Sequence, residues 1–270
     1  MSCKQITPVL RWAGSKRRLL SQLAHALPDG TRYYEPFAGS ACLYFATRPR
    51  RAVLGDLNSE LIGFYRTLRH SPHAVARRLY GWQVDSATYY RVRALNPLEL
   101  GASERAARFL YLNRLCFNGV YRTDRRGRFN VPYGRRTGAL PSTEQLVRCA
   151  STLRAAELRA GDFEATVADA ESGDTVYLDP PYTQRPERSY GVYGYGSFDV
   201  SELERMLRCL EDLDDRGVSF LFSYAQLPGL SERVRPSWSA CEVRTPSSVA
   251  AHTAARVTRH EILLSNAARV

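Results

Sequence analysis

Apolar and polar positions alternate with different spacings along the N-terminal part of the chain. A spacing typical of an amphipathic helix covers residues 15–27, which begin with a capping serine, and recurs over residues 41–47. Short apolar runs predict strands at residues 31–35 and 51–55, and the second strand ends at Asp56. Strand, turn, helix and strand in this order predict the start of a doubly wound α/β sheet.

The pattern becomes helical over residues 58–113, with breaks at Pro72 and Pro97. A β-hairpin is predicted over residues 118–133, with its turn at residues 124–127. We therefore expect the sheet to be interrupted by a helical and β-hairpin insertion.

Strands and helices alternate again after this insertion. An apolar run at residues 174–178 predicts a buried strand that ends at Asp179, and residues 201–214 predict an amphipathic helix. Further strands are predicted at residues 217–222 and 260–264. The predicted domains are a Rossmann-like α/β domain of residues 1–57 and 158–270 and the insertion of residues 58–157.

The composition is that of an ordinary globular protein, with 44% hydrophobic and 24% charged residues in a chain of 270. Its apolar runs are too short for a membrane span, and no apolar signal region follows the first residues. The six cysteines form no C-x-x-C pair, which argues against a disulfide framework or a zinc site. We expect a cytoplasmic protein without a membrane partner or a bound metal, either a monomer or a weak dimer.

The net charge of +11 predicts attraction to polyanions, and nucleic acid is the first candidate. Codon bias is the alternative explanation, because only Lys4 and Lys16 are lysines among the 38 lysine and arginine residues. The same bias singles out Lys16, since a lysine kept there indicates a position that a guanidinium fork does not fit.

The strongest chemical signal is Asp179-Pro180-Pro181-Tyr182, directly after the predicted buried strand. The prolines stiffen the loop and remove two N–H donors, so carbonyl groups project at the carboxyl end of the sheet, where such folds bind ligands. Asp179 and the carbonyl of Pro180 can accept both N–H bonds of an exocyclic amine, while Tyr182 can stack on the base. A purely structural exit from the sheet is the alternative.

Two shorter motifs predict a cofactor site. In E-P-F-A-G, residues 35–39, Gly39 lets a ligand approach the backbone at a strand-to-helix turn. Asp56 can bind ribose hydroxyls or cap the following helix. Near the N-terminus, Trp12 and Lys16 can wrap a small cofactor, although a buried tryptophan explains the same pattern. The turn has neither the G-K-[S/T] of a P-loop nor the G-x-G-x-x-G of a nicotinamide site.

Aromatic, amide and arginine side chains are interleaved between Asn113 and Arg122 and again in the F-N-V-P-Y-G stretch that begins at Phe129. Such a mixture can read base edges in a groove and wedge an aromatic ring between bases. A merely solvated hairpin does not account for Phe117 and Phe129.

Taken together and in this order, the motifs resemble those of the Dam family of DNA adenine-N6 methyltransferases. The family's alpha-group order is an R-W-A-G-x-K-like element, E-P-F-x-G, N-G-x-x-R with F-N-V-P-x-G, and then D-P-P-Y. The similarity runs from about residue 10 to residue 266. Ala41 is a departure, because it stands where F-x-G-x-G usually has its second glycine.

The resemblance implies a bacterial or phage methyltransferase, of a restriction-modification system or an orphan. It would use S-adenosylmethionine to form N6-methyladenine in double-stranded DNA, with the adenine flipped out of the stack. The implied catalytic residues are Asp179, Pro180, Pro181 and Tyr182, and the implied DNA contacts are Arg11, Phe117, Asn118 and Arg122. The implied cofactor contacts are Trp12, Lys16, Phe37, Gly39, Asp56, Asp162, Phe163 and Asp179.

Three alternatives remain open at this point. Related D-P-P-Y-like loops serve other amines, so the substrate could be RNA or the N4 amine of cytosine. A regulator that binds DNA without modifying it is the alternative from another class, although the intact Asp179–Tyr182 motif argues against it.

Overall fold

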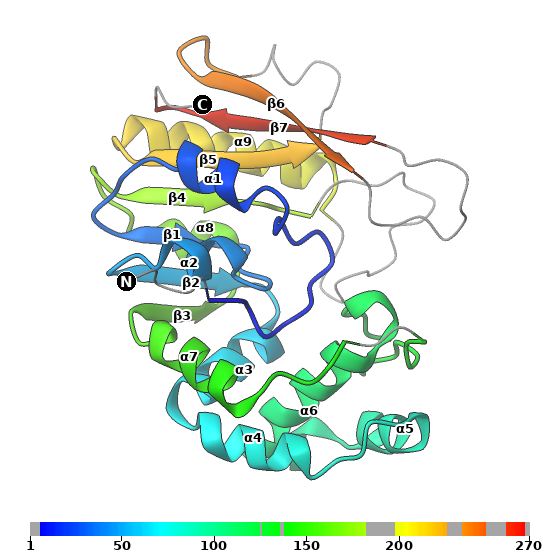
Figure 1. Cartoon of the computed structure of the whole chain (residues 1–270). Coiled ribbons are helices and arrows are strands. Elements are labelled where there is room, and N and C mark those ends of the chain that lie inside the picture. Colours follow the sequence, from blue (N-terminus) through cyan, green and yellow to red (C-terminus); the bar gives the residue numbers. More distant parts are fainter. Residues whose placement is uncertain are drawn as a thin grey trace.

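A seven-stranded sheet organises the chain in the computed structural model (Figure 1). The structure describes residues 6–124, 126–135, 138–181, 198–225, 234–246 and 258–267. The strand order is β3-β2-β1-β4-β5-β7-β6, in which β7 runs antiparallel to both of its neighbours. The strands are β1 (Tyr33–Glu35), β2 (Ala52–Asp56), β3 (Ala156–Ala160), β4 (Thr175–Leu178), β5 (Ser219–Ala225), β6 (Ser239–Pro246) and β7 (Thr258–Ser265).

Helices cover both faces of the sheet. Among the helices of the described residues are α1 (Leu20–Ala26), α2 (Cys42–Thr47), α8 (Phe163–Val167) and α9 (Val200–Asp215). Tyr33 and Tyr177 point to the face that packs on α1 and α2, whereas Tyr34 and Val176 point to the face that packs on α8 and α9. Successive residues of a strand face opposite sides, and every residue of the short strands β1 and β4 is buried, so both of their faces are covered.

A group of helices follows β2 and precedes β3 in the chain. Its members are α3 (Ser59–His70), α4 (Pro72–Tyr80), α5 (Ser86–Ala94), α6 (Ala102–Leu115) and α7 (Thr143–Leu153), with short 3₁₀ turns η1 (Pro97–Glu99) and η2 (Phe117–Gly119). Two arginines of α3 fix this group to the sheet, because Arg66 donates to the carbonyl of Leu158 and Arg69 to the carbonyl of Ala156, both at 2.7 Å. These contacts also cover part of the outer edge of β3, which would otherwise offer unpaired carbonyls.

The order of strands creates a switch point between β1 and β4. The chain leaves β1 toward β2 and β3 on one side, and it returns to β4 and β5 on the other. The carboxyl ends of β1 and β4 therefore lie side by side with the connections diverging, which is where open α/β sheets bind ligands. Figure 1 shows the N-terminal stretch before α1 running along this edge of the sheet.

Most predicted elements are confirmed, but the first helix begins later than expected. The helix predicted over residues 15–27 starts at Leu20, and the prediction that Ser15 caps it is wrong. The Ser15 hydroxyl instead lies 3.2 Å from the hydroxyl of Ser40, in the turn after β1. Residues 15–19 thus serve to join the N-terminal stretch to that turn.

The predicted hairpin is less regular than expected. In its described residues no continuous strand forms, and two isolated bridges join Cys116 to Tyr133 and Thr123 to Phe129. The turn is confirmed, since the N–H of Gly127 donates to the carbonyl of Asp124 at 2.9 Å. A continuous ladder is prevented partly by Pro132, which has no N–H to donate.

Strand β6 was not expected from the sequence. It pairs antiparallel with β7 and forms the edge of the sheet.

Among the described residues, no helix is both long and apolar enough to cross a membrane.

Candidate active site

A buried lysine joins two carboxylates at the carboxyl end of β4. Lys16 Nζ lies 3.0 Å from Asp179 Oδ1 and 3.3 Å from Glu261 Oε2. The lysine side chain is only 4% exposed, and those of Asp179 and Glu261 are 19% and 8% exposed. The three residues come from the N-terminal stretch, the end of β4 and the start of β7, so the tertiary fold brings them together.

Burial changes the acidity of the carboxyl groups at this edge of the sheet. Burial raises the pKa of Asp179 to about 6, against the opposing effect of Lys16. The pKa of Glu35, at the end of β1, is raised by burial to about 8, although the hydroxyl of Tyr33 donates to it at 2.8 Å. Burial also raises the pKa of Asp56 to about 6. Such shifts are typical of functional sites.

The loop after β4 begins as the sequence predicts. Pro180 is buried and Pro181 is partly buried, directly after Asp179. Tyr182, the fourth residue of the motif, lies outside the described residues. The two prolines fix the direction of the chain as it leaves the switch point.

The turn after β1 is held by Asp56 from the neighbouring strand. The N–H of Gly39 donates to Asp56 Oδ2 at 3.0 Å, and the N–H of Asn58 donates to Asp56 Oδ1 at 2.9 Å. Asn58, and not Asp56, caps α3 by accepting from the N–H of Leu61. Each carboxylate oxygen can accept a further bond, so Asp56 can still bind hydroxyl groups.

The group that lies close against Gly39 is a protein side chain, that of Trp12. Gly39 has a φ of +46°, and a Cβ built on it would lie 2.7 Å from Trp12 Cδ1. Trp12 also stacks on Tyr121, with ring centroids 6.0 Å apart. Ala41, which replaces the family's second glycine, keeps a glycine-like backbone with a φ of 50°. The turn therefore retains the left-handed conformation that the motif requires.

Phe37 and Phe163 lie against each other beside this turn. Their rings stack at 5.5 Å, and Arg205 of α9 lies over the Phe163 ring at 4.9 Å. Asp162 caps α8 by accepting from the N–H of Glu164, and it pairs with Arg205 at 2.9 Å. Phe163 is buried and Phe37 is only partly buried, so Phe163 supports the ring that can meet a ligand.

The N-terminal stretch also reaches the loop after α6. The N–H of Arg11 donates to Asn113 Oδ1 at 2.8 Å, and Asn113 Nδ2 donates to the carbonyl of Arg11 at 2.6 Å. Gly119, with a φ of +66°, packs on the side chain of Arg11. Phe117 is 52% exposed and Asn118 is exposed with a φ of 55°, so both project from η2.

The irregular hairpin presents Arg122 and buries Phe129. Arg122 is exposed, and its Nε donates to Asn130 Oδ1 at 2.8 Å. Phe129 is 8% exposed and packs on Tyr121, with ring centroids 5.4 Å apart. The exposed aromatic side chain is therefore Phe117, while Phe129 belongs to the core.

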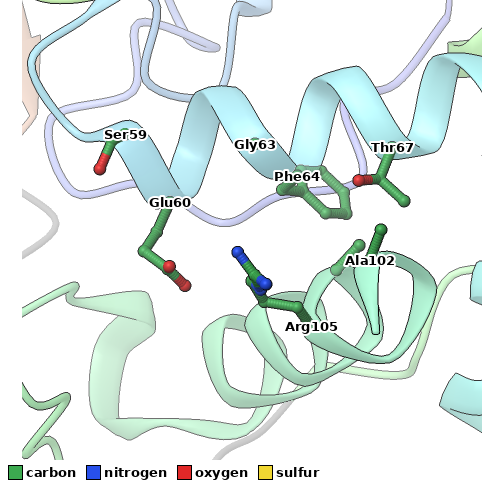
Figure 2. A pocket seen from close by; sticks show the side chains of 8 residues that line it. Ser59, Glu60, Gly63, Phe64, Thr67, Ala102 and Arg105 are labelled. Atoms are coloured by element: carbon green, nitrogen blue, oxygen red, sulfur yellow. The ribbon is translucent and has the colours of Figure 1, made fainter. Parts of the chain in front are cut away.

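A separate hollow of about 130 Å³ lies between α3 and α6. Figure 2 shows Glu60 and Arg105 facing it from opposite helices. Its volume is well below the roughly 300 Å³ at which ligand pockets begin. It is too small for a nucleotide-sized cofactor.

Residues 12–244 match the family described as D12 class N6 adenine-specific DNA methyltransferase. The chain belongs to this family. It methylates adenine in DNA, as the family description and the relatives named DNA adenine methylase agree. This agreement supports adenine in DNA over the RNA, cytosine and non-catalytic alternatives.

Several methyltransferases are similar to this protein over most of its chain. A type II methyltransferase, M1.LlaDCHI, of Lactococcus lactis subsp. cremoris is 31% identical over 97% of this chain and 95% of its own length. A DNA adenine methylase of Escherichia coli strain K12 is 31% identical over 79% of both chains. A type II methyltransferase, M.MjaIII, of Methanocaldococcus jannaschii is 28% identical over 81% of this chain and 84% of its own length.

The chemistry of the D12 site suits a cationic ligand. Two acidic side chains, Asp179 and Glu261, pair with the buried cation Lys16, and Glu35 and Asp56 stand at the carboxyl ends of the neighbouring strands β1 and β2. A methyltransferase needs an activated methyl donor, and S-adenosylmethionine carries a sulfonium cation and an ammonium group. No group of three or more histidine, cysteine or acidic side chains in the described residues has the geometry to hold a metal.

Sequence reasoning missed three residues of the site. Glu261, Asn130 and Arg205 each contact a residue that the motifs had singled out. Asn130 stands within the F-N-V-P-Y-G stretch and Glu261 within the last predicted strand, so their positions were known. The partners of Glu261 and Arg205 were not, because each of these contacts joins segments that the motifs treat separately.

Proposed function

We propose that this D12 enzyme transfers the methyl group of S-adenosylmethionine to the N6 amine of an adenine that is flipped out of duplex DNA. The observation that supports this most strongly is the position of Asp179 and Pro180 at the switch point, with Asp179 paired to the buried Lys16 at 3.0 Å. Flipping is needed because the N6 atom cannot be reached inside the base stack.

Asp179 and Pro180 would act on the amine. The N6 lone pair is delocalised into the ring, which makes the amine a poor nucleophile. Hydrogen bonds from its N–H groups to Asp179 and to the carbonyl of Pro180 would favour a tetrahedral nitrogen, where charge develops in the transition state. Pro181 would keep the carbonyl of Pro180 fixed in direction, and Tyr182 would stack on the flipped base.

The cofactor would be held by the turn after β1 and its neighbours. When bound, S-adenosylmethionine supplies a methyl group activated by its positively charged sulfur. Asp56 would accept from ribose hydroxyls, and the exposed part of Phe37 would contact the adenosyl group, backed by Phe163. The other proposed contacts are Trp12, Lys16, Gly39, Asp162 and Asp179.

Residues 58–157 would form the target-recognition domain. Within it, Phe117 and Asn118 project beside the N-terminal stretch, and Arg122 is exposed on the irregular hairpin. Arg11 is tied to Asn113 and Gly119, which would couple DNA contacts to the segment that carries Trp12 and Lys16. A positively charged protein would add non-specific attraction to the phosphates.

The test is methylation of unmodified plasmid DNA and of matched duplex DNA, single-stranded DNA and RNA with labelled S-adenosylmethionine. Digestion and mass spectrometry of the nucleosides should find N6-methyladenine, with much less product on RNA. N4-methylcytosine as the main product, or binding of DNA without any transfer, would overturn the proposal. Omitting the cofactor provides the control.

A further inference from the structure

Lys16 forms ion pairs with two carboxylates, those of Asp179 and Glu261. Asp179 follows β4, whereas Glu261 lies near the start of β7, opposite Ala225 at the end of β5. Because β7 runs antiparallel to β5, its beginning lies at the edge where the parallel strands end. The fold therefore delivers a second acidic side chain to the switch point from the C-terminal part of the chain.

We propose that Glu261 is a positioning residue for methyl transfer, which shares Lys16 with Asp179 and so keeps the Asp179 carboxylate a strong hydrogen-bond acceptor for the amine. This inference rests on the proposed role of Asp179. It assigns a function to a glutamate that no motif singled out.

The geometry supports this division of charge. The distances from Lys16 Nζ to the two carboxylates are 3.0 and 3.3 Å, so neither carboxylate holds the cation alone. All three side chains are largely buried, where charges are weakly screened. Without the charge of Glu261, Lys16 would pair with Asp179 only. The Asp179 carboxylate would then be a weaker hydrogen-bond acceptor, and the pKa of its carboxyl group would be lower.

The charges around Asp179 agree with this assignment. Lys16 of the N-terminal stretch, Tyr177 of β4 and Glu261 of β7 act on it directly. Glu35 of β1 and Cys42 of α2 also interact with it electrostatically. Lys16 lowers the pKa of Asp179, while Glu261 raises it. Removing the charge of Glu261 should therefore lower the pKa of Asp179.

The experiment compares the wild-type protein with Glu261→Gln and the control Glu242→Gln. Glu242 lies on the adjacent strand β6, opposite Ile262, and is exposed. Carboxyl-labelled aspartate reports the Asp179 titration by carbon NMR, and Asp179→Asn assigns its signal. We expect Glu261→Gln to lower the Asp179 pKa by about 0.5–1 unit and Glu242→Gln to leave it unchanged.

Kinetics give the second readout. If Asp179 must be ionised to accept from the amine, the acid limb of kcat/KM should move to lower pH in Glu261→Gln by a similar amount. The plateau kcat should fall by about threefold to tenfold, with little change in the KM for DNA. An equal loss of activity at all pH values, with an unshifted Asp179 signal, would overturn the proposal. Glu261 would then be only the structural ion-pair partner of Lys16.

Two further measures keep the outcome decisive. If Glu261→Gln does not fold, Glu261→Asp retains the charge one methylene farther from Lys16 and should give a smaller shift in the same direction. The NMR titration does not depend on turnover and therefore measures the coupling between Asp179 and Glu261 by itself. A wild-type protein without methyltransferase activity would overturn the proposed function but not this coupling. An unshifted signal in both variants would defeat the coupling.

Discussion

Trp12 packs on Gly39 so closely that a Cβ at residue 39 would lie 2.7 Å from the indole Cδ1. This contact joins the N-terminal stretch to the turn of the proposed cofactor site. Gly39→Ala should therefore displace Trp12 and strain a backbone whose φ is +46°. We expect a loss of about 1–3 kcal/mol in the free energy of unfolding and weaker binding of S-adenosylmethionine.

Gly63→Ala in α3 is the matched control for this substitution. No heavy atom lies within 4 Å of a Cβ built there, and alanine favours helices. This variant should gain about 0.5–1 kcal/mol and bind the cofactor normally. Urea unfolding and calorimetric titration measure both effects, and equal stability of the two variants would show that Trp12 moves aside without cost.

Asp179→Ala should reduce kcat by about 100-fold or more, because it removes an acceptor for the amine in the transition state. DNA affinity should change only slightly, since phosphate contacts dominate it. Asp212→Ala removes an equal charge from the exposed face of α9 and should keep full activity. Turnover by Asp179→Ala within tenfold of the wild type would show that Asp179 is not catalytic.

Lys16→Arg should weaken binding of S-adenosylmethionine although the positive charge is kept. Lys16 is 5% exposed and fits between two carboxylates, where a planar guanidinium requires more room. Calorimetric titration should show about a tenfold loss of affinity, which corresponds to about 1.4 kcal/mol. An unchanged affinity would mean that the site accepts any cation at this position.

Arg122→Ala should relax sequence specificity at one position of the DNA site. Asn130 holds its Nε, and within the described residues the two terminal nitrogens have no partner, so they can bind one guanine together. We expect a loss of discrimination of about 1–3 kcal/mol, measured by methylation of duplexes with single substitutions. Asn130→Ala should show a smaller loss at the same position.

Arg128→Ala is the control for this prediction. Arg128 is 68% exposed at the hairpin turn and pairs with Asp124. Its loss should weaken methylation of all duplexes alike and reduce the salt dependence of binding. The same uniform pattern in Arg122→Ala would reduce Arg122 to a backbone contact.

Glu35→Gln should remove part of the pH dependence of stability. Burial raises the pKa of Glu35 from 4.5 to about 8, so its neutral form is favoured by folding. This contribution is complete below the unfolded value and is lost as the pH rises through about 8. Between about pH 5 and pH 9, wild-type stability should fall by roughly 3–5 kcal/mol more than that of Glu35→Gln in urea unfolding. Parallel curves would show that Glu35 is already ionised.

The sequence by itself determined the parts of the protein that depend on local patterns. The apolar run at β4, followed by Asp179 and two prolines, predicted a buried strand with an acidic, stiff exit. The E-P-F-A-G turn predicted a close approach to Gly39, and in the structure Trp12 lies against this glycine. Periodicity and turn residues report on a few neighbouring positions, so they are reliable over such distances.

Only the tertiary structure decided which distant residues meet. The antiparallel direction of β7 brings Glu261 to Lys16, and strand β6 was not expected at all. Packing on Tyr121 buried Phe129 and left Phe117 as the exposed ring, although the two looked equivalent in sequence. Strand order, strand direction and the filling of the core depend on interactions across the whole chain, and no local pattern of side chains encodes them.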